Sequence, residues 1–160
     1  MGVDTQQIQG FDDLAAKLRE IPKAMRKRVL RNSLAAGARL VRDAARRSAP
    51  VLSAAAARKA PYRTPGLLKN SVVVRTSKQD RRNGNVGVFV NVRPAKSGMR
   101  GAKSKSDPFY WRFVNFGTAK MPARPFLSGA AAQLPQALQV FQGAVGKWVA
   151  KTNATGKVNP

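Results

Sequence analysis

The sequence predicts a single α+β domain over residues 1–160, with two amino-terminal helices, a small, mostly antiparallel sheet of about three or four strands, and a carboxy-terminal amphipathic helix. Three observations support this fold class. Apolar residues recur at helical spacing through 12–47, valines alternate with other residues within 71–92, and an apolar seam advances in steps of four and three through 126–150. A chain of 160 residues is long enough to bury one core without disulfides.

Two helices are predicted in the amino-terminal part of the chain. Pro22 suits the first position of a helix, and nothing interrupts the helical pattern until Pro50, so the longer helix is expected over 22–47. A shorter helix is expected over 12–20, because apolar residues follow one another at helical spacing from Phe11 onwards, namely Phe11, Leu14, Leu18 and Ile21.

The longer helix has two contrasting faces. Its apolar arc is wider than the roughly 100° that one core requires, so the helix is expected to pack against two partners, such as the sheet and either the first helix or a neighbouring subunit. A narrow stripe on the other side is either a solvated face or a contact for DNA or an acidic partner. The stripe carries five arginines: Arg28, Arg31, Arg39, Arg42 and Arg46.

The next stretch changes from loop to strand. Residues 48–66 are rich in Ala, Pro and Ser and predict an extended loop, with a short helical segment as the alternative for 53–59. Within 71–92, a valine triplet, a polar turn containing Asn83 and Gly84, and a second run of alternating valines predict a β-hairpin.

A basic loop is predicted over 93–107. The segment has no apolar period and cannot bury enough surface to order itself in an isolated chain. Its cations are either solvated, or dock an acidic partner, or contact DNA. These candidates are Arg93, Lys96, Arg100, Lys103 and Lys105.

Aromatic residues are concentrated in 109–118, where five of the eleven in the chain fall within eight positions. Their alternation predicts a third strand, and a short helix is the alternative. The apolar seam of 126–150 predicts a helix that Pro135 kinks, unless the helix begins late. Residues 151–160 are polar and predict a flexible tail.

Charge and missing residue types narrow the function. Thirty Lys and Arg face seven Asp and Glu, which favours polyanions or acidic protein surfaces as partners. The chain has no histidine and no cysteine, and its carboxylates are scattered, so we expect no enzyme, no metal site and no cofactor. No apolar run approaches the ~20 residues of a membrane-spanning helix, and we expect no membrane contact.

Two motifs resemble those of a known family. An aromatic run ending in Phe116-Gly117-Thr118 precedes Met-Pro-Ala-Arg-Pro-Phe-Leu at 121–127, and Ala-Pro-Tyr-Arg-Thr-Pro-Gly-Leu-Leu-Lys-Asn-Ser at 60–71 leads into the hairpin. In order and spacing they resemble the small head-tail joining, neck and tail-completion proteins of long-tailed bacteriophages, the tail-component family typified by the gene-ten product of a lambdoid siphophage. Family members usually carry an acidic residue where this chain has Asn115.

The resemblance implies a structural virion protein of the phage neck. It would be a ring-forming subunit, commonly six- or twelve-fold, that joins the head portal or connector to the tail-tube or tail-terminator proteins and is needed for tail completion or attachment. Its location would be the head-tail junction of the virion, after assembly in the host cytoplasm. We expect the subunit or ring contact at Phe116, Gly117, Thr118 and Arg124. The alternative for the apolar part of this segment is that it only folds the chain.

Two other functions remain open. A virion-morphogenesis type of tail-completion factor shares the Ala-Arg-Pro-Phe-Leu ending. From a different class, a free, non-specific nucleic-acid-binding protein would use the basic surface for phosphates and the aromatic segment to stack bases. Within a ring, the basic loop would make only weak, non-specific contact with genomic DNA in the lumen, because tight binding would obstruct DNA ejection.

Overall fold

The structure is a computed structural model that describes residues 15, 16, 19, 23–59, 64–95, 98, 100–102 and 104–155. The helix predicted over 12–20 lies almost wholly outside these residues, as do residues 156–160 of the predicted tail.

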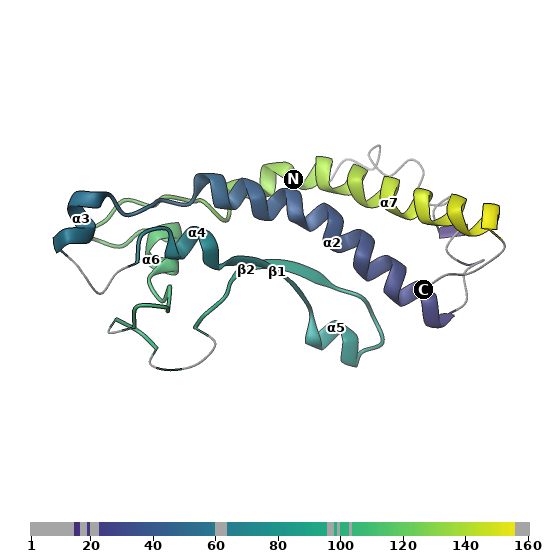
Figure 1. Ribbon diagram of the computed structural model, residues 1–160, viewed down its shortest axis with the longest axis horizontal. Helices are drawn as coiled ribbons and strands as arrows, with labels where there is room; N and C mark the ends of the chain where they lie inside the picture. The colour runs from purple at the N-terminus through teal and green to yellow at the C-terminus, as the bar shows by residue number, and fades with distance from the viewer. Residues whose placement is uncertain are drawn as a thin grey trace.

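Helix α2 (Lys23–Ser48) lies in the middle of the molecule, between helix α7 (Leu134–Thr155) and a two-stranded sheet (Figure 1). Its bounds are within one residue of the predicted 22–47. The wide apolar arc explains this position, because one part of it packs on α7 and another part on the sheet. The expectation of two packing partners, one of them the sheet, is therefore confirmed. The second partner in the described part of the chain is α7, where the sequence had suggested the first helix or a neighbouring subunit.

The sheet consists of β1 (Val72–Thr76) and β2 (Val88–Val92), which pair antiparallel with Val72 opposite Val92. The predicted hairpin is confirmed, although its connection is a long loop that contains helix α5 (Lys78–Arg82). The hydroxyl of Ser77 caps this helix by accepting a hydrogen bond from the backbone N–H of Asp80. The described residues form two strands, so the prediction of three or four strands is wrong.

The strand missing from the sheet is the aromatic segment, which forms helix α6 (Trp111–Phe116). A turn precedes the helix, in which the carbonyl of Pro108 accepts a hydrogen bond from the N–H of Trp111, and Gly117 follows its last residue. Apolar residues occupy nearly every position of this segment, so alternation did not distinguish strand from helix. The helix buries Asn115 and leaves Phe113 and Phe116 exposed, whereas a strand would have needed cover on both faces.

Several short elements connect these layers. The 48–66 loop contains helix α3 (Ala54–Lys59), as the helical alternative predicted, and α4 (Leu67–Ser71) leads directly into β1. The carboxy-terminal helix begins late: a 3-10 helix, η2 (Gly129–Gln133), precedes α7, and Pro135 occupies the first turn of α7, where it costs no hydrogen bond. Residues 151–155 continue α7, so the flexible tail predicted from residue 151 is wrong over these five residues.

Two clusters of buried apolar residues hold the layers together. The first joins α2 and the sheet to α4 and to the segment after α6, and its largest members are Leu68, Val72 and Phe126. Burial of each such side chain contributes about 1.5–3 kcal/mol. The second joins Phe141 and Val145 of α7 to the amino-terminal half of α2.

Gly37 sets the distance between α2 and α7. A Cβ atom at this position would overlap the backbone carbonyl oxygen of Ala137 on α7. The two helix backbones therefore approach each other more closely here than any residue with a side chain would allow. This contact explains a glycine in the middle of a long helix, where it costs about 1 kcal/mol relative to alanine.

Candidate interaction surfaces

The segment after α6 folds back on that helix. Gly117 has a φ of 76° and a ψ of 179°, a conformation open essentially to glycine alone. Thr118 and Met121 pair as an isolated antiparallel β-bridge, and the N–H of Arg124 donates a hydrogen bond to the carbonyl of Val114 at 2.8 Å. The chain thereby reverses direction and delivers Phe126 into the core.

Two of the contact residues predicted in the segment after α6 have exposed side chains. Thr118 and Arg124 both face solvent, and Arg124 lines a shallow pocket beside Pro50 and Tyr110. Gly117 and Phe126 serve the turn and the core. The arrangement leaves Arg124 accessible to a neighbour without loss of a side-chain bond within the described residues.

An apolar surface lies on α6. Phe116 is 70% exposed and Phe113 is 50% exposed, and their spacing of three places them on the same side of the helix. Met121, in the turn that follows, is also exposed. We call Phe113, Phe116 and Met121 the α6 surface. Exposed phenylalanines that lie side by side on one face of a helix are typical of a protein contact.

An apolar groove lies where α2, β2, η2 and α7 meet. Its volume is about 680 Å³, and every lining residue is apolar. Leu134, at the start of α7, is 58% exposed, and Phe89 of β2 is 41% exposed. The lining residues are Leu34, Ala38, Val41, Val88, Phe89, Val90, Leu127, Ala131, Leu134, Ala137, Leu138 and Phe141.

The arginine stripe of α2 is divided by its surroundings. Arg39, Arg42 and Arg46 line a groove of about 330 Å³ against β1, and Arg75 of β1 completes it. Arg28 and Arg31 are exposed nearer the start of α2 and do not line this groove. The structure therefore brings three of the five predicted arginines together with a fourth that sequence did not single out.

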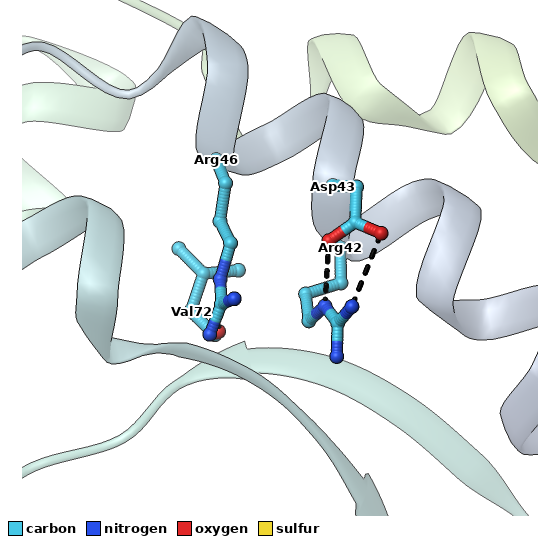
Figure 2. Close-up of polar contacts among 4 residues, drawn as sticks. All are labelled: Arg42, Asp43, Arg46 and Val72. Atoms are coloured by element: carbon cyan, nitrogen blue, oxygen red, sulfur yellow. Dashed lines mark hydrogen bonds and ion pairs between the residues drawn. The ribbon is translucent and has the colours of Figure 1, made fainter.

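Two of these arginines are already engaged (Figure 2). Arg46 donates from Nε to the backbone carbonyl of Val72 at 3.1 Å, and Arg42 forms a two-bond ion pair with Asp43, with an Nε to Oδ1 distance of 2.8 Å. The hydrogen bonds from Arg42 lower the pKa of the Asp43 carboxyl below its usual value; partial burial opposes this, and the charges of Arg42, Arg46 and Arg47 add to it.

The basic loop is better anchored than its sequence predicts. Asp107 is buried, and its carboxylate accepts hydrogen bonds from the N–H groups of Ala95 at 3.3 Å and Gly101 at 2.8 Å. Ala95 is buried as well, so the two ends of the predicted loop are held together. Arg93, Arg100 and Lys105 are exposed, while Lys96 and Lys103 lie outside the described residues.

Some residues of these surfaces were not identified from the sequence. The apolar groove draws on residues from four elements, and no local pattern predicts it. Asp107 and Gly37 carried a usable signal, because an isolated acid in a basic segment and a glycine within a long helix each require a structural reason.

The fold and these surfaces define a small, strongly basic α+β protein with open apolar contact surfaces. The model of one protein family matches residues 12–117, which is 106 of the 160 residues, and its description is "Bacteriophage HK97-gp10, putative tail-component". The chain belongs to this family, and the resemblance found in its motifs is confirmed. It is thus a phage tail component, a class of protein located in the virion.

Two further comparisons gave no relatives: no curated protein and no solved structure matches the chain. Among the described helices, none is long and apolar enough to cross a membrane. The family match ends at Gly117, so the segment 121–127 and helix α7 lie beyond it.

Proposed function

We propose that this protein is a ring-forming structural subunit of the phage neck, which joins the head portal or connector to the tail and completes or attaches the tail. The tail-component family supports a place in this part of the virion. The apolar groove carries the proposal of self-assembly, because a cavity of about 680 Å³ lined only by apolar side chains is open in the single chain.

The α6 surface supplies a second, unlike contact. It lies on α6, which belongs to a different part of the chain from the four elements that form the groove. An interface between two unlike surfaces joins subunits head to tail, and such contacts close into a ring when the rotation permits. In the proposed ring, Phe113 and Phe116 of one copy enter the groove of the next.

The function proposed here depends on contacts and requires no catalysis, metal or cofactor. Part of the positive charge would face acidic virion proteins. The exposed cations of the basic loop, Arg93, Arg100 and Lys105, would make weak contacts with the phosphates of DNA passing through the ring.

Deletion of the gene from the phage tests the role. Electron microscopy of lysates should then show DNA-filled heads separate from tails, and supplying the protein in trans should restore joined particles. Infectious virions formed in the complete absence of this protein would contradict the proposal.

Charged substitutions test the head-to-tail contact separately from the role. Leu134→Asp places a charge in the groove, and Phe116→Asp places one on the α6 surface; both positions are exposed, so both variants should fold. Each variant alone should fail to form rings. A mixture of the two should stop at dimers, because the intact α6 surface of the Leu134 variant can bind only the intact groove of the Phe116 variant. Val140→Asp is the control, because Val140 is also exposed on α7 but does not line the groove.

Salt-dependent DNA binding distinguishes the nucleic-acid-binding alternative. Submicromolar binding of random DNA at physiological salt, without any ring, would favour that alternative. The fluorescence of the aromatic residues of α6 would then be expected to be quenched when the protein binds single-stranded DNA.

A further inference from the structure

We infer that the open edge of β1, beneath the arginines of α2, is a docking site for an extended acidic segment of another virion protein, which adds to the sheet as a third strand. We call this site the β1 edge; it is formed by Val74 and Thr76 of β1 with Arg39, Arg42 and Arg75 around them. The inference goes beyond ring assembly, and neither depends on the other.

The hydrogen-bond pattern of the hairpin shows which backbone groups are free. The N–H of Arg93 donates to the carbonyl of Ser71, and the N–H of Ser77 donates to the carbonyl of Gly87, both at 2.8 Å. In an antiparallel ladder, alternate residues point their N–H and C=O groups to the same side. Ser71 and Ser77 point towards β2, so Val72, Val74 and Thr76 point away from it.

The outward carbonyl of Val72 is already bonded. Arg46 donates to the carbonyl of Val72, which confirms its outward direction (Figure 2). Val74 and Thr76 have no partner for their outward groups among the described residues. A row of unpaired backbone groups is a template for another strand.

The charge around this edge selects an acidic occupant. Arg39 and Arg75 are exposed and form no ion pair within the described residues, and the single acid of α2, Asp43, is paired with Arg42. Consecutive arginines of the groove are three and four residues apart, or about 4.5 and 6 Å along the helix axis. Alternate residues of an added strand are about 6.6 Å apart, a similar step. Acidic residues at alternate positions would therefore lie below the arginines.

The same edge disfavours nucleic acid and a second copy of this chain. Phosphates only accept hydrogen bonds, and the outward carbonyls of Val74 and Thr76 would face them unfavourably, whereas a peptide strand offers both donors and acceptors. A second copy carries the same excess of positive charge, which repels it from a groove of arginines. The occupant that fits both properties is an acidic peptide from a different protein.

Fluorescence anisotropy with the full chain tests the inference. The probe is a labelled peptide in which Glu alternates with Val, and its twin carries N-methyl groups on the residues that would donate to β1. The probe should bind, and the methylated twin, with the same charge, should bind at least about tenfold more weakly, because the strand-pairing donors are lost. Equal binding of the two peptides would overturn the inference.

Matched charge variants locate the site. Arg39→Ala with Arg75→Ala should weaken probe binding about tenfold or more, since charge-assisted hydrogen bonds are the strong ones. Arg31→Ala with Arg81→Ala removes the same charge from exposed positions outside the groove and should change binding less than about twofold. Equal losses in both pairs would overturn the inference, because binding would then depend on net charge alone.

Two further measurements separate the other occupants. A single-stranded DNA oligonucleotide should not compete for the β1 edge, and competition that disappears in Arg39→Ala with Arg75→Ala would assign the site to nucleic acid instead. Neutralising the amino-terminal acids Asp4, Asp12, Asp13 and Glu20 should leave probe binding unchanged. Tighter binding after neutralisation would show that the chain's own segment occupies the edge, and would overturn the inference.

Discussion

The side-chain Oδ1 of Asn115 accepts a hydrogen bond from the backbone N–H of Leu127 at 3.0 Å, and a longer one from Ser128. Asn115 is 2% exposed and lies in α6, while Leu127 follows the turn that returns from that helix. One buried side chain thus links the two parts of the motif that resembles the phage family, the aromatic run and the segment 121–127. Most of the motif therefore stabilises the fold, and its exposed residues are the ones available for contact with neighbouring proteins.

Substitution of Asn115 tests this account of the motif. Asn115→Ala removes the acceptor of two part-buried hydrogen bonds, each of which contributes about 0.5–1.5 kcal/mol, and should lower the free energy of unfolding by about 1–3 kcal/mol. Asn115→Asp retains the oxygen that accepts both hydrogen bonds and removes the side-chain NH2 group, which is buried without a partner in the described structure. Chemical denaturation at neutral pH should therefore rank the aspartate variant above the alanine variant. The reverse order would contradict the assigned bonds.

The close approach of α2 and α7 predicts opposite effects at two glycines. Gly37→Ala should destabilise the protein by about 1–3 kcal/mol, because the added methyl group overlaps the carbonyl of Ala137 and forces the helices apart. Gly143→Ala, on α7, meets open space and should be neutral or stabilise the protein by up to about 1 kcal/mol. Thermal unfolding of both variants measures the difference, and stabilisation by Gly37→Ala would show that the helices do not meet there.

The ion pair of Asp43 with Arg42 predicts a small dependence of stability on pH. The folded state lowers the pKa of Asp43, so its contribution is complete above the ordinary carboxyl pKa, near pH 4, and is lost as the pH falls through the lowered value. The pair is partly exposed, so the contribution should be about 0–1 kcal/mol and weaken with salt. The difference in unfolding free energy between the wild type and Asp43→Asn should follow this course. A difference that grows as the pH falls would contradict it.

Arg124 is predicted to act in assembly rather than in folding. Its side chain is exposed, and only its backbone N–H and carbonyl groups form hydrogen bonds in the turn. Arg124→Ala should therefore change the free energy of unfolding by less than about 0.5 kcal/mol while reducing the yield of joined particles in a complementation assay. Lys120→Ala, in the same turn and also exposed, is the control. Normal head-tail joining by the Arg124 variant would remove this residue from the proposed contact.

The elements that the sequence predicted well are those whose periodicity has one interpretation. Helix α2 follows from an uninterrupted helical pattern between two prolines, and the hairpin follows from a valine triplet and a run of alternating valines on the two sides of a polar turn. The segment at α6 was predicted as a strand from the alternation of its side chains, with a short helix as the alternative. Apolar residues occupy most of its positions, which suits either period. Its helical state depends on tertiary partners, above all on the burial of Asn115 against the chain near Leu127.

The interaction surfaces were harder to predict, because they depend on distances between elements. The arginine stripe was visible as a helical period, yet its division into a groove at Arg39, Arg42 and Arg46 depends on where β1 lies. Arg75 joins them only through the register of the hairpin. The apolar groove has no local signal, since its residues come from α2, β2, η2 and α7 and, at Leu127, from the segment before η2.

A reconstruction of the virion neck by electron cryomicroscopy tests the central proposal most directly. We predict a closed ring of this protein between the head and the tail, in which Phe116 of each copy lies in the groove beside Leu134 of the next copy. A neck without this protein, or a ring in which that groove faces solvent, would contradict the account.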